Sequence, residues 1–70
     1  MIYREVARKL WRLGCQELPR RGGGSPRKWY NPAMNRGTTI SDWGSKDLKI
    51  GTLHAAVGQL GLTWKDFEEA

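Results

Sequence analysis

The sequence predicts an α+β fold in which one helix is followed by three strands, a second helix and a short C-terminal helical turn. Two observations predict it. Apolar residues recur at three- and four-residue steps near both ends of the chain, which is the spacing of one helix face. Between these stretches lie short β-branched and aromatic runs, separated by glycine-rich and proline-containing turns. We therefore expect a three-stranded antiparallel sheet with two helices on one face, while the other face stays open.

The first helix is expected near the N-terminus, with Gly14 as its C-terminal cap. The apolar residues with helical spacing are Tyr3, Val6, Ala7, Leu10 and Leu13. Arg4, Arg8 and Arg12 recur at every fourth position, which places them on one stripe on or beside the solvent face. Such a stripe is usually a solvated face, and contact with phosphates is the alternative.

The middle of the chain predicts three strands. Residues 15–20 form a short strand that enters the loop Arg20 to Ser25, where three glycines leave the backbone too free for regular structure. Residues 27–31 form the second strand, and residues 38–40 have the β-branched content of a third. The turn between these two strands contains Pro32, Asn35 and Gly37. The second and third strands are therefore expected to form a hairpin.

The last third of the chain predicts a polar loop over residues 42–49 and then the second helix. The apolar residues expected on one face of this helix are Ile50, Leu53, Val57 and Leu60. Gly61 can cap its end. Thr63, followed three residues later by Asp66, resembles a capping box with Asp in place of Glu, and it opens the final helical turn.

The length of 70 residues allows one domain, residues 1–70. A chain of this size buries only about 60% of the surface that its unfolded form exposes, so its core is thin. Bulky side chains therefore supply much of the burial. We expect most of the tryptophans to lie in the core, the four being Trp11, Trp29, Trp43 and Trp64.

Cys15 is the only cysteine, so no internal disulfide can form, which favours a reducing compartment. We expect it to be a small buried side chain and not a nucleophile, since the only histidine, His54, lies far along the chain. No apolar run approaches the ~20 residues that a membrane span needs, and no signal peptide is present. These features predict a cytoplasmic protein without membrane association.

The net charge of +5 is unevenly distributed. Residues 1–49 contain eleven Lys or Arg against four acids, whereas residues 50–70 contain Lys65 against three acids. A basic body with an acidic tail suggests a polyanionic partner that contacts one face. The alternative is that the charge only maintains solubility.

The stretch from Arg20 to Asn31 is the most informative for function. Four cations lie within nine residues with no acid among them, namely Arg20, Arg21, Arg27 and Lys28. Glycines between them let backbone N–H groups approach a phosphate closely. If the strand alternates strictly, Trp29 points into the core, and Lys28 and Tyr30 point out from the open face. A cation beside an aromatic ring suits a nucleotide, although an ordinary amphipathic strand after a flexible loop would look the same.

Two stretches resemble signatures of the HicA toxins. The first, GSPRKWYNP (residues 24–32), is similar to the glycine-serine-histidine strand of that family, and the second, KDLKIGTL (residues 46–53), to the signature that opens its last helix. The similarity continues through QLGL (59–62) and WKDF (64–67). It implies a double-stranded-RNA-binding-like α-β-β-β-α fold and a type II toxin that cleaves messenger RNA. It also implies a hetero-oligomer with a neutralising HicB-type antitoxin.

The resemblance further implies metal-independent acid–base chemistry by a histidine, whose imidazole takes the proton from a 2′-hydroxyl that then attacks the adjacent phosphate. That histidine would stand at position 26, where this sequence has Pro26. Proline has no titratable group and no N–H, so we expect an intact fold with a disabled catalytic centre. We expect no metal or other cofactor. The residues expected to contact RNA are Arg20, Arg21, Gly24, Ser25, Arg27, Lys28 and Tyr30, and an acidic antitoxin surface is expected over the four cations among them.

Two functions stay open at this point. The chain is either an RNA-cleaving toxin scaffold that has lost its general base, or a non-catalytic module that binds RNA or only a protein partner. His54 is interpreted as a solvated or partner-contacting residue, and Trp43 as a residue packed under its loop. Asp42 and Asp47 bracket that loop, but two carboxylates alone make a weak metal site.

Overall fold

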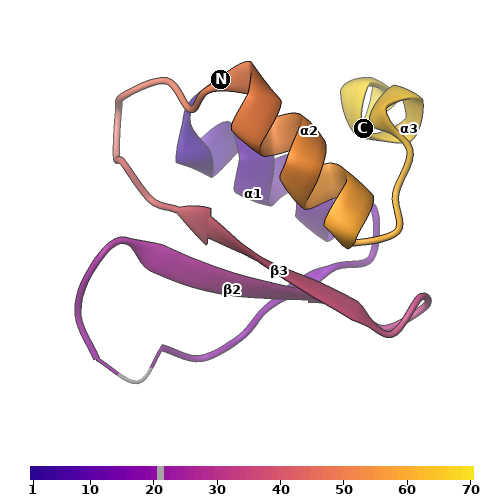
Figure 1. Ribbon diagram of the computed structural model, residues 1–70, viewed down its shortest axis with the longest axis horizontal. Helices are drawn as coiled ribbons and strands as arrows, with labels where there is room; N and C mark the ends of the chain where they lie inside the picture. The colour runs from indigo at the N-terminus through magenta and orange to yellow at the C-terminus, as the bar shows by residue number, and fades with distance from the viewer. Residues whose placement is uncertain (21) are drawn as a thin grey trace.

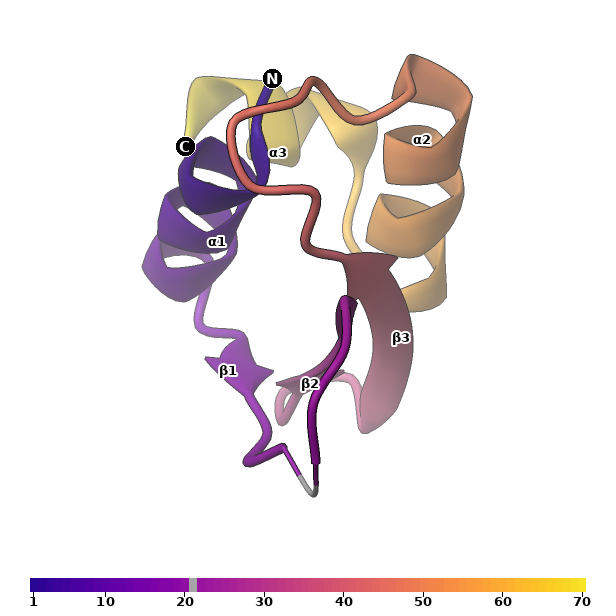
Figure 2. The ribbon, with the colours of Figure 1, turned by 90° about the vertical axis from the view of Figure 1, so that its left-hand side faces the viewer.

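The computed structural model describes residues 1–20 and 22–70 (Figure 1). Its elements, in chain order, are α1 (Tyr3–Arg12), β1 (Gln16–Glu17), β2 (Pro26–Asn31), β3 (Arg36–Ser41), α2 (Ile50–Gln59) and α3 (Trp64–Glu69). This order is the predicted α-β-β-β-α pattern with a short terminal helix. The strands form an antiparallel sheet in the order β1-β2-β3. All three helices lie on one side of it, with α1 near β1 and α2 near β3, so the opposite face is open (Figure 2).

The register of β2 and β3 sets which side chains face the helices. The pairing runs from Pro26 opposite Ser41 to Asn31 opposite Arg36. Trp29 is buried toward the helices, whereas the neighbouring Lys28 is exposed and Tyr30 is half-buried on the other side. The alternation predicted for this strand is therefore confirmed.

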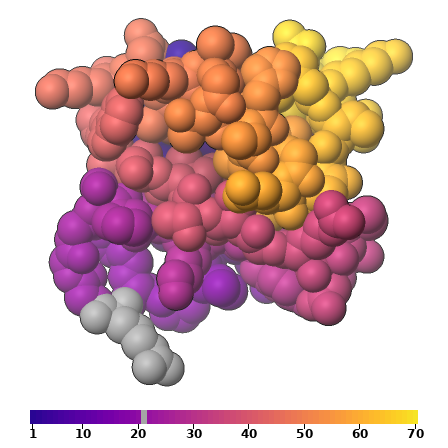
Figure 3. Space-filling model, in the orientation of Figure 1, coloured from indigo at the N-terminus to yellow at the C-terminus, as the bar shows by residue number. Residues whose placement is uncertain are grey.

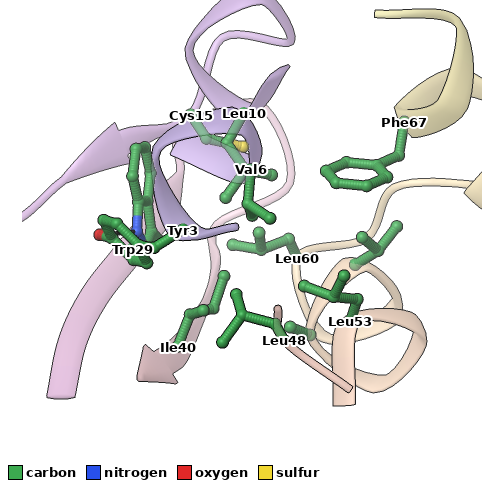
Figure 4. Close-up of a cluster of buried hydrophobic side chains, with 12 residues drawn as sticks. Tyr3, Val6, Leu10, Cys15, Trp29, Ile40, Leu48, Leu53, Leu60 and Phe67 are labelled. Atoms are coloured by element: carbon green, nitrogen blue, oxygen red, sulfur yellow. Dashed lines mark hydrogen bonds between the residues drawn. The ribbon is translucent and has the colours of Figure 1, made fainter. Parts of the chain in front are cut away.

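The core lies between the sheet and the helical layer (Figure 4). Side chains from all three helices, from β2 and β3 and from the connecting segments meet there, and the most completely buried large ones are Trp29, Phe67, Leu10, Ile40, Leu53 and Leu60. Cys15 is also in the core, 2% exposed, and burial raises the pKa of its thiol. The expectation of a small buried side chain at this position is therefore confirmed.

The expectation that most of the tryptophans lie in the core is wrong, because only Trp29 does so. Trp11 is 68% exposed, since it follows core residue Leu10 and each step along a helix turns the side chain by about 100°. Trp43 is 44% exposed on the loop after β3, so it is not packed under that loop. Trp64 is partly buried at the margin of the core, where its ring stacks on His54 with 3.6 Å between the ring centroids.

The helix ends follow the sequence predictions, with one exception inside α2. Gly14 and Gly61 adopt the left-handed conformation that ends a helix, with φ of 88° and 75°. The Thr63 hydroxyl accepts a hydrogen bond from the Asp66 N–H at 3.1 Å and so caps α3. Ile50, however, is 62% exposed. It is the first residue of α2, and this end of the helix lies farthest from the sheet (Figure 1). Among the described residues, no helix has both the length and the apolar character needed to cross a membrane.

Candidate nucleic-acid interface

A groove of about 540 Å³ lies where the loop between β1 and β2 meets the start of β2. We call it the loop groove, and the described residues that line it are Leu18, Pro19, Arg20, Gly22, Gly23, Pro26 and Lys28. Arg20 is exposed and donates a hydrogen bond to the carbonyl oxygen of Gly24 at 2.5 Å. The strands and this loop form the lower side of the molecule, away from the helices (Figure 3). A molecule in the loop groove would therefore meet exposed cations and an accessible Pro26.

A second hollow, of about 470 Å³, continues along the sheet, and we call it the sheet hollow. Its lining residues are Leu18, Lys28, Trp29, Tyr30, Gly37, Thr38, Thr39 and Gln59. Leu18 and Lys28 line both hollows, so the two adjoin at these residues. Together they make a trough that runs from the glycine-rich loop onto the open face.

Tyr30 lines the sheet hollow, and a hydrogen bond holds its ring in place. Its hydroxyl donates a hydrogen bond to Asn35 Oδ1 at 2.7 Å. Gly37 is its partner across the β2–β3 ladder and has no side chain to cover the ring. A Cβ at Gly37 would lie 3.1 Å from the carbonyl oxygen of Trp29, which is closer than such atoms usually approach. The glycine thus permits close strand packing and leaves room beside the tyrosine ring.

Arg27 lies on the other side of the sheet from Lys28 and Tyr30. Its Nη1 donates to Glu17 Oε2 at 2.8 Å and its Nη2 to Asp42 Oδ2 at 3.0 Å, while its guanidinium lies over the Tyr3 ring at 5.6 Å. The hydrogen bond to Glu17 is the main cause that raises the pKa of Arg27. Its Nε is buried and has no partner among the described residues. Two carboxylates neutralise this cation, so the structure does not bring it together with the other residues expected to contact RNA.

Glu17 and Asp42, the two carboxylates that bind Arg27, belong to a larger hydrogen-bonded network. Tyr3 Oη donates to Glu17 Oε1 at 2.6 Å and accepts from Trp29 Nε1 at 2.9 Å. Burial, followed by the hydrogen bond with Glu17, raises the pKa of Tyr3 well above its ordinary value, so the hydroxyl stays a donor. The network thereby joins α1, β1 and β2.

Asp42 extends this network to the segment that precedes Pro26. Its backbone N–H donates to the Ser25 carbonyl at 2.7 Å, and its Oδ1 accepts from the Gly44 N–H at 2.9 Å. Sequence reasoning missed Tyr3, Glu17 and Asp42 as neighbours of the site. A signal was present, because Glu17 and Asp42 are the only acids between residues 6 and 46 and they flank the basic stretch on both sides.

The remaining predicted site residues are divided between the loop and the helical layer. Gly24 and Ser25 are exposed on the loop, next to the loop groove. Arg21 lies outside the described residues. His54 is exposed on α2 and stacked on Trp64, so it belongs to the helical layer and not to the trough.

The trough can bind an anion, but the described residues that line the loop groove include no acid–base group for neutral pH. The side chains that line the loop groove are apolar or cationic, and its glycines have none. Among the described residues that line it, there is no histidine, carboxylate or thiol. Lysine and arginine stay charged at neutral pH and serve as donors and counter-ions. The trough therefore provides the cations of Arg20 and Lys28, the backbone of the glycine-rich loop and the ring of Tyr30, and Pro26 lies beside these cations in the loop groove.

These features define a class: a small α-β-β-β-α domain with helices on one face of its sheet and a basic trough on the other. Within that class, the family model described as the HicA toxin of bacterial toxin-antitoxin matches residues 3–62, and the chain belongs to this family. It is thus the toxin of a toxin–antitoxin pair, with a cognate antitoxin as its partner. α3 lies beyond the matched residues. No curated protein and no solved structure was found to match the chain.

Proposed function

We propose that this chain is a type II toxin that binds messenger RNA in the trough, built on the scaffold of a metal-independent endoribonuclease whose general base has been lost at position 26. The observation that carries the proposal is the place of Pro26. It is exposed, it is the first residue of β2, and it shares the loop groove with Arg20 and Lys28. A histidine at this point would lie where those cations hold an RNA phosphate.

The proposed chemistry assigns each group one task. A histidine at position 26 would take the proton of a 2′-hydroxyl, and the freed oxygen would form a bond to the adjacent phosphorus. The bond from phosphorus to the 5′-oxygen would break, and that oxygen would leave with a proton from water. Lys28 and Arg20 bind the phosphate and stabilise the negative charge that develops on it. With Pro26 the binding groups remain and the proton acceptor is missing, so the chain binds RNA and cleaves it poorly.

Lys28 is the residue with which to test RNA binding. Lys28→Glu is expected to weaken binding of a single-stranded RNA and to lower the slope of log affinity against log salt by about 1, because one phosphate contact is lost. Fluorescence anisotropy over a range of salt concentrations measures both quantities. Lys65→Glu is the matched control, since it makes the same charge change at an exposed position on α3. Equal effects of the two variants would mean that only net charge matters and that the trough is not the binding site.

Tyr30 tests whether a base stacks in the sheet hollow. Tyr30→Ala is expected to lose about 1–2 kcal/mol of RNA binding, in the lower part of the range for a base stacked on an aromatic ring. Tyr30→Phe keeps the ring and removes only the hydrogen bond to Asn35. It should bind RNA nearly as well as the unchanged chain in the same anisotropy assay. If Phe and Ala weaken binding equally, the hydroxyl matters and the stacking interpretation fails.

We also propose that the antitoxin is of the HicB type and covers Arg20 and Lys28 with an acidic surface, which would exclude RNA by charge and by shape. Competition supplies the test, since the antitoxin should displace a labelled RNA from the trough. Arg27→Glu is unsuitable for this purpose, because it would place a third carboxylate beside Glu17 and Asp42 and disturb the fold.

The second candidate is a non-catalytic module that binds RNA or the antitoxin alone. Pro26 itself favours it, since the residue has no acid–base chemistry. The two candidates differ in what a histidine at position 26 would do, because only a catalytic scaffold would gain cleavage from it.

A further inference from the structure

Trp11 is the most exposed large apolar side chain of the described structure, at 68%. It lies on α1, directly after Leu10, which is completely buried. Tryptophan has an apolar ring with one polar N–H, and aromatic residues of this kind are enriched at protein interfaces. Packing in the core therefore does not explain why a tryptophan occupies position 11, on the outer side of the helical layer.

Three arginines surround Trp11 on the same helix. With about 100° between successive residues, Arg4, Arg8 and Trp11 share one stripe and Arg12 lies beside it. All four side chains are exposed, and we call them the α1 face. No ion pair or side-chain hydrogen bond joins the three arginines to any of residues 1–20 and 22–70, in contrast to Arg27. The only acid on α1, Glu5, accepts a hydrogen bond from the Ile2 N–H at the start of the helix.

The α1 face is separate from the trough. α1 lies in the helical layer, whereas the trough lies along the loop and the open face of the sheet (Figure 2). An RNA strand in the trough and a partner on the α1 face would therefore contact different sides of the molecule. A role in the proposed RNA site does not account for these four residues.

We propose that the α1 face is a docking surface for an acidic segment of the antitoxin, with Trp11 as its apolar anchor. The inference rests on family membership, which supplies the protein partner, and not on the proposed catalytic role of the scaffold. Tryptophan and arginine are the residue types that most often dominate the energy of protein interfaces. Three unpaired guanidinium groups fit carboxylates well, because each can donate two parallel hydrogen bonds to one carboxylate.

The charge of the α1 face argues against a second copy of this chain as its occupant. A symmetric contact through α1 would bring the same patch of each copy together, and thus arginines against arginines. An acidic partner removes that repulsion and speeds association. Anchoring at α1 would also let the antitoxin bind while the trough is still occupied by RNA, and then cover the trough from that attachment point.

The test measures the affinity of the folded chain for the antitoxin of its own pair. Trp11→Ala is expected to weaken that affinity about 30-fold, the effect of losing one interface anchor. Trp43→Ala is the matched control, because it removes another exposed tryptophan from a loop outside the α1 face. It should change the affinity by less than about threefold. Arg8→Glu should weaken binding, and its effect should shrink at high salt.

Two further measurements separate the possible outcomes. The melting temperature of Trp11→Ala should equal that of the unchanged chain, since the ring is outside the core, and its affinity for single-stranded RNA should be unaffected. The inference is overturned if Trp11→Ala and Trp43→Ala bind the antitoxin equally, or if the unchanged chain does not bind the antitoxin. It is also overturned if Trp11→Ala loses RNA affinity while antitoxin binding is retained, because the α1 face would then be a nucleic-acid surface. Failure of the proposed RNA site would appear separately, in the Lys28→Glu experiment.

Discussion

Replacing Pro26 with histidine is expected to raise the rate of RNA cleavage by about 10²–10⁴-fold, the usual contribution of a general base. Position 26 is exposed in the loop groove and starts β2, so a larger polar side chain can be placed there without entering the core. Proline holds φ near −65°, a value that histidine also adopts, so the backbone need not change. The imidazole should act as its neutral form, and cleavage should therefore rise as the pH passes upward through about 6.5.

Single-turnover cleavage of a labelled single-stranded RNA, followed over pH, measures this gain. Pro19→His is the matched control, because Pro19 also lines the loop groove and the substitution introduces an imidazole at a different point. Inducing each variant in cells without antitoxin should stop growth only for Pro26→His. If Pro26→His binds RNA but cleaves no faster than Pro19→His, the chain is a binding module and the catalytic scaffold is the wrong interpretation.

The fold could be predicted because local periodicity and the turn residues agree with the tertiary structure. Gly14 and Gly61 end the helices where the apolar spacing stops, and the period of two in β2 places Trp29 inside and Lys28 outside. The prediction for Trp11 is wrong for a physical reason. The helical spacing that identified α1 already sets Trp11 on the arginine side, but the size of its side chain argued for burial. Periodicity, and not size, decides which residues of a short helix reach the core.

The candidate site was predicted less well than the fold. Adjacency in the sequence groups Arg27 with Lys28, yet adjacent residues of a strand point to opposite faces. The alternation that places Lys28 in the trough thus places Arg27 with Trp29. Its partners Glu17 and Asp42 lie ten and fifteen residues away, and the strand register is needed to bring them together.

Arg27→Met is expected to lower the free energy of unfolding, and to do so by clearly more than a substitution at an unpaired surface lysine. Removal of the cation leaves two carboxylates without their partner. Solvent moderates the loss, because the three side chains remain about a quarter exposed, 25% for Arg27, 27% for Glu17 and 25% for Asp42. The two carboxylates would also face each other without a cation. A domain of this size has only about 3–5 kcal/mol of stability from its core, so even a moderate loss is measurable. Urea unfolding, followed by the fluorescence of the tryptophans, measures the change.

Lys28→Met is the matched control for this prediction, since it makes the same substitution on the next residue, which is exposed and has no carboxylate partner among the described residues. It should change stability by less than about 0.5 kcal/mol and weaken RNA binding, whereas Arg27→Met should reduce RNA binding only in proportion to the unfolded fraction. A double-mutant cycle with Glu17→Gln should show a favourable coupling energy between the two residues. If Arg27→Met were instead fully stable and defective in RNA binding, the guanidinium would be an RNA ligand, as its neighbours in the sequence suggest. The ion pairs would then contribute little to folding.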